Sequence, residues 1–332
     1  MRITHVGFGS WAVGGDWVNG WGSQDDSDSV AAIRRAVARG VNWIDTAAAY
    51  GLGHSEEVVA AALAPIPQGE RPYVFTKCGQ IPDPANPRAQ PKRIGAPASI
   101  RRELEGSLRR LKVERIDLYQ MHWPPEDGTP LEVHWRTLLD LKKEGKVRAV
   151  GLSNHDNGQL EAAEKLGHVD TLQPPFSAIR RGAGGLEIPW CEAHLTGVIV
   201  YSPMQSGLLT GSFSEERAAS LPANDWRSRD AEFKGPALRG NLRVAEAMRN
   251  IAERRGTTTG AVAVAWTLAW PGVTGAIVGA RNADQVDGWI DAATLSLTPS
   301  ELDEIAAVID RTGAGVGPSR PPLAMATASA AE

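Results

Sequence analysis

The sequence has little cysteine and no paired-cysteine motif. Its 332 residues include two cysteines, Cys78 and Cys191, which lie far apart along the chain. Small disulfide-stabilised domains contain several bridges, and structural zinc sites of the common type need closely spaced cysteine pairs. The composition therefore excludes a disulfide scaffold and argues against a structural zinc site.

Long apolar runs and an excess of one charge sign are also missing. No run of about 18 apolar residues occurs, and the first residues, Met-Arg-Ile-Thr-His-Val-Gly, contain no apolar signal core. The 35 Lys and Arg residues face 39 Asp and Glu, which gives a formal net charge of −4. Nucleic-acid-binding proteins usually carry a basic patch. We therefore expect a soluble, cytoplasmic protein with neither a nucleic-acid nor a membrane partner.

Apolar residues make up 42 % of the sequence, which is enough for a large core and excludes a mainly disordered chain. Short runs rich in β-branched residues alternate with longer helical patterns. The predicted strands are Thr4–Gly9, Val41–Asp45, Pro72–Lys77, Ile116–His122, Val147–Leu152, Val169–Gln173, Gly197–Tyr201 and Gly275–Gly279. Helices are predicted between them, among others at Asp26–Arg39, Ser99–Leu111 and Leu131–Lys143.

Strand followed by helix, eight times over, indicates parallel strands that close into a (β/α)8 TIM barrel, an α/β fold. The alternative is a doubly wound open sheet, which normally carries a GxGxxG turn after its first strand. Here Gly7-Phe-Gly9 is followed by Ser-Trp-Ala-Val, which does not fit that turn. We predict one barrel domain at 1–312 and a flexible tail rich in Gly, Pro, Ala and Ser at 313–332.

One connection in the predicted barrel is much longer than the others. The chain between Tyr201 and Gly279 far exceeds the ~30 residues of an ordinary βα unit, and it contains the polar segment Pro203–Arg239. Helices at Asn241–Arg255 and Thr258–Trp270 are predicted to fill the remainder. Long loops in compact domains often serve as lids or binding segments. The sequence therefore predicts a lid-like insertion after strand seven.

Ionisable residues stand at the ends of three consecutive predicted strands. Asp45 ends the second strand, Lys77 the third and His122 the fourth, and Tyr50 follows Asp45 in the next loop. Barrel enzymes build their active sites at this end of the strands, so the four side chains are expected to converge. Asp45 would hold Lys77 charged, and the Lys77 ammonium is expected to lower the pKa of Tyr50 from its usual ~10. His122 would hydrogen-bond a bound carbonyl oxygen. A metal bound by Asp45 and His122 is a weaker alternative, because no other histidine lies at a strand end.

Taken in order, the motifs of this chain resemble those of the aldo-keto reductase family. The matches are Gly7-x-Gly9-x-Trp11, Gly-Val-Asn-Trp-Ile-Asp45-Thr-Ala-x-x-Tyr50-Gly, Gly53-x-Ser55-Glu56, Thr-Lys77-Cys-Gly, Met-His122-Trp-Pro, Gly151-Leu-Ser153-Asn154, Tyr201-Ser202-Pro203 and Gly279-Ala-Arg281-x-x-x-Gln285. Each motif is weak alone, but their order and spacing cover nearly the whole chain. The resemblance implies a catalytic tetrad of Asp45, Tyr50, Lys77 and His122, with Tyr50 as the proton donor. It also implies NADPH-dependent hydride transfer to an aldehyde or ketone, or the reverse oxidation of an alcohol.

The resemblance also implies a site for NADPH, extended across the barrel mouth. Ser153, Asn154 and Gln173 would hold the carboxamide, and Tyr201 would stack on the nicotinamide. Arg281 and Gln285 would hold the adenosine 2′-phosphate at a helix start. The implied cofactor-binding residues are Trp11, Asp45, Ser153, Asn154, Gln173, Tyr201, Ser202, Pro203, Gly207, Leu208, Gly279, Arg281 and Gln285, of which Ser202, Pro203, Gly207 and Leu208 would lie beneath the pyrophosphate.

The chain departs from the family pattern in two places. The N-terminal hairpin that usually covers the barrel floor is not apparent, because the first predicted strand begins almost at Met1. Gly288 and Trp289 stand where many relatives have an acid or amide near the adenine. The resemblance therefore assigns no contacts to the adenine.

The expected substrate residues are mostly aromatic: Trp21, Tyr50, His122, Trp123, Met204 and Trp226. Such a pocket suits apolar or polycyclic carbonyls and sugar rings equally well.

Two other functions stay open. A cofactor-sensing partner of a membrane channel is disfavoured because no long N-terminal interaction segment is seen. A lyase that forms a Schiff base with Lys77 would give Tyr50 and Arg281 no reason to be where they are. No heptad or edge-strand signal is present, so a monomer is expected.

Overall fold

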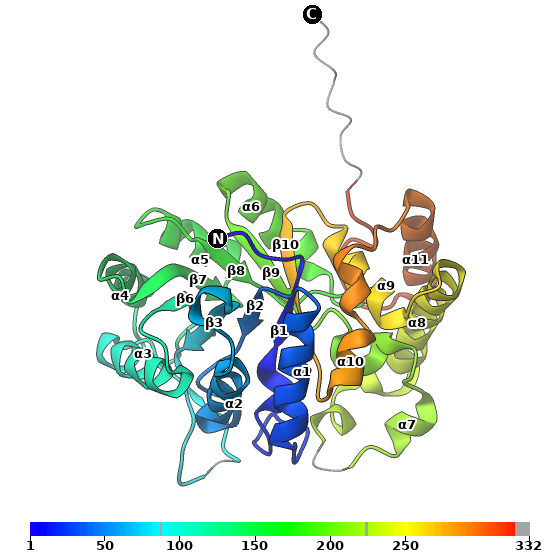
Figure 1. The fold of residues 1–332 in the computed structure, drawn as a ribbon. Helices are drawn as coiled ribbons and strands as arrows, with labels where there is room; N and C mark the ends of the chain where they lie inside the picture. The colour runs from blue at the N-terminus through cyan, green and yellow to red at the C-terminus, as the bar shows by residue number, and fades with distance from the viewer. Residues whose placement is uncertain (87, 223–224, 323–332) are drawn as a thin grey trace, which may run out of the picture.

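The predicted strands pair in parallel and close into a barrel that the helices surround (Figure 1). The structure is a computed structural model, and it describes residues 1–86, 88–222 and 225–322. Each strand of the barrel pairs with the barrel strands that precede and follow it in sequence, and β1 closes the ring against β10. The prediction of a (β/α)8 TIM barrel is therefore confirmed.

The observed strands agree closely with the predicted ones. The barrel consists of β1 (Val6–Gly9), β2 (Trp43–Asp45), β3 (Tyr73–Cys78), β6 (Ile116–Met121), β7 (Val147–Ser153), β8 (Thr171–Gln173), β9 (Gly197–Tyr201) and β10 (Val273–Gly279). Two short strands, β4 (Gln80–Ile81) and β5 (Lys92–Arg93), form a separate antiparallel hairpin after β3. This hairpin was not predicted, because two-residue strands leave no periodic pattern.

Four of the five helices with predicted bounds begin and end within two residues of them, and the fifth, α8 (Gly235–Arg255), begins six residues before the predicted Asn241. The helices are α1 (Asp26–Ala38), α2 (His54–Leu63), α3 (Pro97–Leu111), α4 (Leu131–Lys143), α5 (Asn157–Glu164), α6 (Glu187–His194), α7 (Glu215–Ala219), α8 (Gly235–Arg255), α9 (Thr259–Leu268), α10 (Ala283–Asp287) and α11 (Pro299–Thr312). Caps fix several ends: Asp25 accepts the backbone N–H of Ser27 before α1, and Thr298 with Glu301 forms a capping box on α11. Among the described helices, none is both long and apolar enough to cross a membrane.

Trp43 fills the end of the barrel where the strands begin. It belongs to a small cluster inside the barrel, and its indole N–H donates to the carbonyl oxygen of Thr4, 2.8 Å away. A Cβ placed on Gly7 would lie 2.2 Å from the Trp43 ring, so Gly7 leaves the space that this ring needs. The residues before β1 form no strand in the structure. Trp43 and the chain at Thr4 thus occupy the barrel floor. The larger apolar core lies between the strands and the surrounding helices and includes Ile33 and Leu138.

The long connection between β9 and β10 reaches over the barrel mouth, as the sequence predicts. It contains η5 (Gln205–Thr210), α7, η6 (Trp226–Ser228), η7 (Ala231–Phe233), α8 and α9. Arg227 donates to the carbonyl oxygen of Ser206 at 3.1 Å, and its guanidinium lies 5.1 Å from the ring centroid of Trp21. Trp21 belongs to the loop after β1. The insertion therefore contacts a loop from the first βα unit across the mouth.

Residues 313–322, which belong to the segment expected to be a flexible tail, pack against the barrel. Arg181 is buried, and its guanidinium donates to the carbonyl oxygens of Ala314 at 2.9 Å and Gly317 at 3.2 Å. Arg320 forms an ion pair with Asp303 of α11. These contacts attach the segment to the barrel. The rest of the expected tail, 323–332, lies outside the described residues.

Candidate active site

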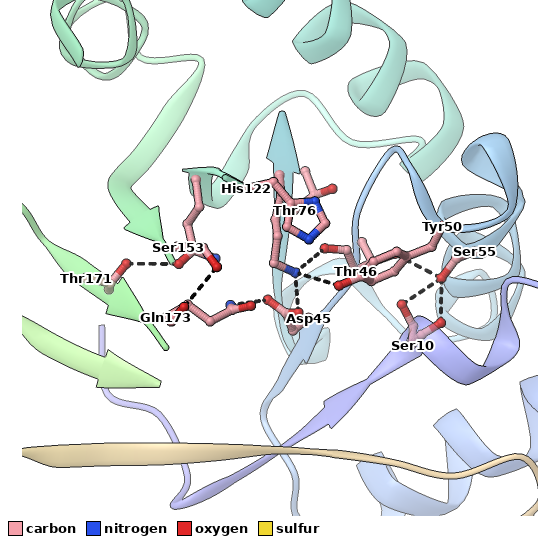
Figure 2. Close-up of polar contacts among 12 residues, drawn as sticks. Ser10, Asp45, Thr46, Tyr50, Ser55, Thr76, His122, Ser153, Thr171 and Gln173 are labelled. Atoms are coloured by element: carbon pink, nitrogen blue, oxygen red, sulfur yellow. Dashed lines mark hydrogen bonds and ion pairs between the residues drawn. The ribbon is translucent and has the colours of Figure 1, made fainter. Parts of the chain in front are cut away.

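The structure brings Asp45, Tyr50, Lys77 and His122 together at the carboxyl end of the barrel strands. Figure 2 shows Asp45, Tyr50 and His122 of this group. Asp45 is the last residue of β2, and Lys77 is on β3. His122 directly follows β6, and Tyr50 opens the short helix η2 (Tyr50–Gly53) after β2. All four side chains are buried. The convergence expected from the strand ends is therefore present.

Lys77 is the centre of the hydrogen bonds in this group. Its Nζ lies 2.5 Å from Asp45 Oδ1, 2.8 Å from the carbonyl oxygen of Thr46 and 3.4 Å from Tyr50 Oη. The second carboxylate oxygen of Asp45 accepts a hydrogen bond from Gln173 Nε2 at 2.9 Å. Both charged side chains are thus held on two sides, and the ammonium is directed at the phenol oxygen.

Burial acts on both charges of this pair. Loss of solvent raises the pKa of Asp45 and lowers the pKa of Lys77, while the charge of each partner opposes the shift. Burial followed by the negative charge of Asp45 also raises the pKa of Tyr50 well above its usual value. The expectation that Lys77 lowers the pKa of Tyr50 is therefore wrong. Burial, the larger cause, and the negative charge of Asp45 together outweigh the effect of the ammonium on the pKa of the phenol.

His122 is a neutral imidazole in this setting. Burial lowers its pKa well below the usual value, and the positive charges of Lys77 and Arg93 lower it further. Its ring centroid lies 5.6 Å from that of Tyr50 in an edge-on arrangement. The backbone N–H of His122 donates to the carbonyl oxygen of Cys78 at 3.0 Å, which holds the residue at the end of β3 and β6. The rings of Tyr50 and His122 are thus in contact.

A second polar group lies beside the first and consists of hydroxyl and amide side chains. Ser153 Oγ donates to the carbonyl oxygen of Gln173 at 2.9 Å, and Asn154 Nδ2 donates to Ser153 Oγ at 3.1 Å. The Tyr201 hydroxyl donates to Asn154 Oδ1 at 2.8 Å. Asn154 has a φ of 62°, a left-handed conformation that asparagine tolerates better than most residues. Figure 2 shows that Gln173 links this group to Asp45.

A cavity of about 470 Å³ opens over both groups. All six expected substrate residues line it, and so do eleven of the thirteen expected cofactor residues. The lining residues from these two sets are Trp11, Trp21, Asp45, Tyr50, His122, Trp123, Ser153, Asn154, Gln173, Tyr201, Ser202, Pro203, Met204, Gly207, Trp226, Gly279 and Gln285. Lys77 does not line the cavity, because its side chain is completely covered beneath Tyr50.

Leu208 and Arg281 are the two expected cofactor residues that do not line the cavity. The side chain of Leu208 is buried in the large apolar core. The guanidinium of Arg281 is turned toward the loop before α1, where Nε donates to Gln24 Oε1 at 2.5 Å and Nη2 to the carbonyl oxygen of Ser23 at 2.7 Å. The expected helix start lies nearby, since α10 begins at Ala283. Trp289 is also buried in the core.

Several lining residues were missed by the sequence analysis. They come mainly from the loop after β1, the β4–β5 hairpin and the loop after β8, and include Asn19, Gln80, Gln90, Arg93 and Arg180. Gln80 follows Lys77 by three residues, so its position after a strand end was a usable signal. Gln90 and Arg93 carried none, because their hairpin returns to the mouth without a motif.

The comparisons with known proteins agree with this geometry. The sequence profile described as the aldo/keto reductase family matches residues 5–310. The Bacillus subtilis aldo-keto reductase YhdN is 32 % identical over 94 % of this chain and 92 % of its own. The Escherichia coli NADH-specific methylglyoxal reductase is 30 % identical over 94 % of this chain and 97 % of its own. The solved structure of the glycerol dehydrogenase AKR11B4 from Gluconobacter oxydans superposes with a TM-score of 0.84, at 37 % identity, over 98 % of this chain and 96 % of that one. Because the profile and the relatives cover nearly all of the barrel, the chain belongs to the aldo/keto reductase family of oxidoreductases.

Proposed function

We propose that this protein is an NADPH-dependent reductase of aldehydes and ketones, which also oxidises the corresponding alcohols in the reverse direction. The observation that carries the proposal is the buried chain of contacts from Asp45 through Lys77 to the hydroxyl of Tyr50, beside the His122 ring and open to the cavity. Tyr50 is the proton donor in this proposal.

The raised pKa of Tyr50 keeps the phenol protonated before reaction. A neutral phenol donates a hydrogen bond to a carbonyl oxygen and transfers its proton as negative charge develops on that oxygen. The Lys77 ammonium, 3.4 Å from the phenol oxygen, stabilises the phenolate that remains. Asp45 and the carbonyl oxygen of Thr46 hold the ammonium in place, so they act through Lys77.

His122 would orient the carbonyl group. Because its pKa is lowered well below the usual value, the ring carries one N–H and no charge at neutral pH. Its edge-on contact with Tyr50 places both groups at one wall of the cavity. A carbonyl oxygen between them receives two hydrogen bonds, one from the phenol and one from the imidazole.

The residues of the cavity fit a nicotinamide cofactor, which when bound supplies the hydride. Ser153, Asn154 and Gln173 offer hydroxyl and amide groups for the carboxamide at one place on the wall. The Tyr201 ring is held there by its bond to Asn154 and offers an aromatic face for stacking. Gly207, with a φ of 99°, lets the backbone pass close to a bound phosphate.

Arg281 supports the preference for NADPH. A guanidinium has five N–H donors, and the bonds to Gln24 and Ser23 use two of them. The remaining donors suit a 2′-phosphate, which NADH lacks. The Escherichia coli relative is NADH-specific, so the opposite preference is the outcome that the experiment must distinguish.

The test is to measure cofactor oxidation by the purified protein across aldehydes, simple ketones, sugars and polycyclic ketones. We expect turnover that is faster with NADPH than with NADH. Faster turnover with NADH would overturn the NADPH preference and leave the reductase intact. Cofactor binding without turnover across the panel would support the cofactor-sensing alternative, and absence of cofactor binding would overturn both.

A further inference from the structure

The ionised side chains that line the cavity are mostly arginines. Among the described lining residues, the permanently charged candidates are Asp45, Arg93 and Arg180, because His122 is held neutral by burial. Asp45 is already neutralised by Lys77, 2.5 Å away. The cavity therefore carries two positive charges and no free negative charge of its own.

The two arginines act on different parts of the cavity. Arg180, in the loop after β8, lines the cavity together with Tyr201, at the proposed cofactor site. Its positive charge opposes the rise in the Tyr201 pKa that burial causes. Arg93 lines the cavity together with His122, at the proposed carbonyl site, and its positive charge lowers the pKa of His122 further than burial alone. A bound nicotinamide does not account for a positive charge beside the carbonyl, because the ring and its carboxamide carry no anionic group.

Arg93 is held firmly at this wall. It lies on β5, paired with Gln80 of β4, and the N–H of Ile94 donates to the carbonyl oxygen of Gly79 at 3.0 Å. Gly79 directly follows β3, the strand that carries Lys77. The Arg93 guanidinium also lies 4.5 Å from the ring centroid of Trp123, next to His122 in sequence. Stacking on an aromatic face orients the guanidinium plane.

The one ion-pair partner of Arg93 in the described chain leaves donors available. Arg93 Nη1 lies 2.7 Å from Glu126 Oε1, and the Glu126 side chain is 67 % exposed. Glu126 does not line the cavity. Ion pairs with such an exposed partner are weak, and one bond uses only one of the five guanidinium donors.

We propose that Arg93 forms a subsite for an anionic group of the substrate. The preferred substrates are then short aldehydes or ketones that carry an oxyanion, a carboxylate or a phosphate ester, separated from the carbonyl group by a short carbon chain. A guanidinium binds either group through paired hydrogen bonds. The inference rests on the proposed reductase function and names its substrate class.

The kinetic test compares substrates that differ only in the anionic group. Succinic semialdehyde is matched with butanal, and glyceraldehyde 3-phosphate with glyceraldehyde. We expect kcat/KM to favour the charged member of at least one pair, and Arg93→Gln to reduce this preference about ten- to a hundredfold, mainly through KM. If only succinic semialdehyde is preferred over its uncharged partner, the subsite binds a carboxylate. If only glyceraldehyde 3-phosphate is preferred, the subsite binds a phosphate ester. Rising ionic strength should weaken the preference.

Two variants control for general effects on the hairpin. Arg88→Gln removes the other hairpin arginine, which pairs with Asp16 and does not line the cavity, and should leave the preference unchanged. Glu126→Gln should retain or increase it. An unchanged preference in Arg93→Gln, or no preference in the unmodified enzyme, would overturn the inference while turnover of butanal upholds the reductase.

A binding measurement keeps the inference testable without turnover. Succinate, which has no carbonyl to reduce, should quench the fluorescence of the tryptophans around the cavity, and Arg93→Gln should weaken its binding about ten- to a hundredfold. Weaker binding of succinate to Arg93→Gln than to the unmodified protein would support the subsite even if no aldehyde is reduced. Equal binding to both proteins would overturn it.

Discussion

Lys77 Nζ lies 2.5 Å from Asp45 Oδ1, and both side chains are buried at the ends of neighbouring barrel strands. The ion pair with Asp45 holds the Lys77 ammonium 3.4 Å from the hydroxyl oxygen of Tyr50. A buried ion pair contributes little net stability when both partners are present, but loss of one partner leaves an uncompensated charge. The ion pair therefore holds the Lys77 charge in position, and each of the two side chains needs the other to compensate its charge.

Replacing Lys77 by Met should destabilise the protein strongly. Asp45 would keep the hydrogen bond from Gln173 but lose its counter-charge. We expect the free energy of unfolding to fall by about 3–5 kcal/mol at pH 7, measured by urea denaturation. The double variant Asp45→Asn with Lys77→Met should recover much of the stability and none of the activity. A single variant as stable as the unmodified protein would show that Asp45 takes up a proton at little cost.

Tyr50→Phe should abolish turnover and leave cofactor affinity nearly intact. The substitution removes the proton donor and keeps the ring that packs against Trp17 and His122. We expect kcat to fall by about 10²–10⁴-fold, with the cofactor dissociation constant measured by fluorescence titration. Tyr73→Phe is the matched control, because Tyr73 is on β3 and does not line the cavity. Equal losses of turnover and cofactor affinity would instead assign Tyr50 a structural role.

The barrel could be predicted because its strands and helices alternate with clear signals. Asp45, Lys77 and His122 stand at strand ends, and the topology of a parallel barrel alone brings such ends together. Their convergence needed no knowledge of side-chain contacts. The floor was harder: Trp43 fills it by lying against Gly7, a contact between strands that no local pattern displays.

Features that depend on distant contacts or on burial could not be predicted. The partners of Arg281, Gln24 and Ser23, lie at the other end of the sequence. The β4–β5 hairpin that brings Arg93 to the cavity is too short for a periodic signal. The direction of the Tyr50 pKa shift depends on how much solvent the fold removes and on the charge of Asp45, whereas the charge of Lys77 alone suggested the opposite sign.

Arg281→Ala should weaken the binding of NADPH much more than that of NADH. If the free guanidinium donors bind the 2′-phosphate, their loss should raise the NADPH dissociation constant about ten- to a hundredfold. Gln24→Ala is the comparison, since Gln24 joins the loop before α1 to Arg281 through two bonds, including Nε2 to the Arg281 carbonyl oxygen at 2.7 Å. Its loss should change the affinity for both cofactors alike. Similar losses for both cofactors in Arg281→Ala would remove Arg281 from the 2′-phosphate.

A buried histidine pair should make the protein less stable as the pH falls below 6.5. The rings of His134 on α4 and His155 after β7 lie 6.1 Å apart, and burial lowers the pKa of each to about 4. An unfolded histidine titrates near 6.5, so between the two values the unfolded chain binds more protons than the folded one. Stability is therefore complete above about pH 6.5 and is lost as the pH falls toward 4.

Replacing His134 by Leu should remove part of this loss. Neither ring nitrogen of His134 has a hydrogen-bond partner among the described residues, so an apolar side chain suits the site. The free energy of unfolding of both proteins is measured by urea denaturation at pH 8 and at pH 5. Between these two pH values, the difference between variant and unmodified protein should shift in favour of the variant by about 2 kcal/mol. His5→Gln, at an exposed position, is the control. A variant whose stability changes with pH as steeply as that of the unmodified protein would mean that His134 is protonated in the folded state.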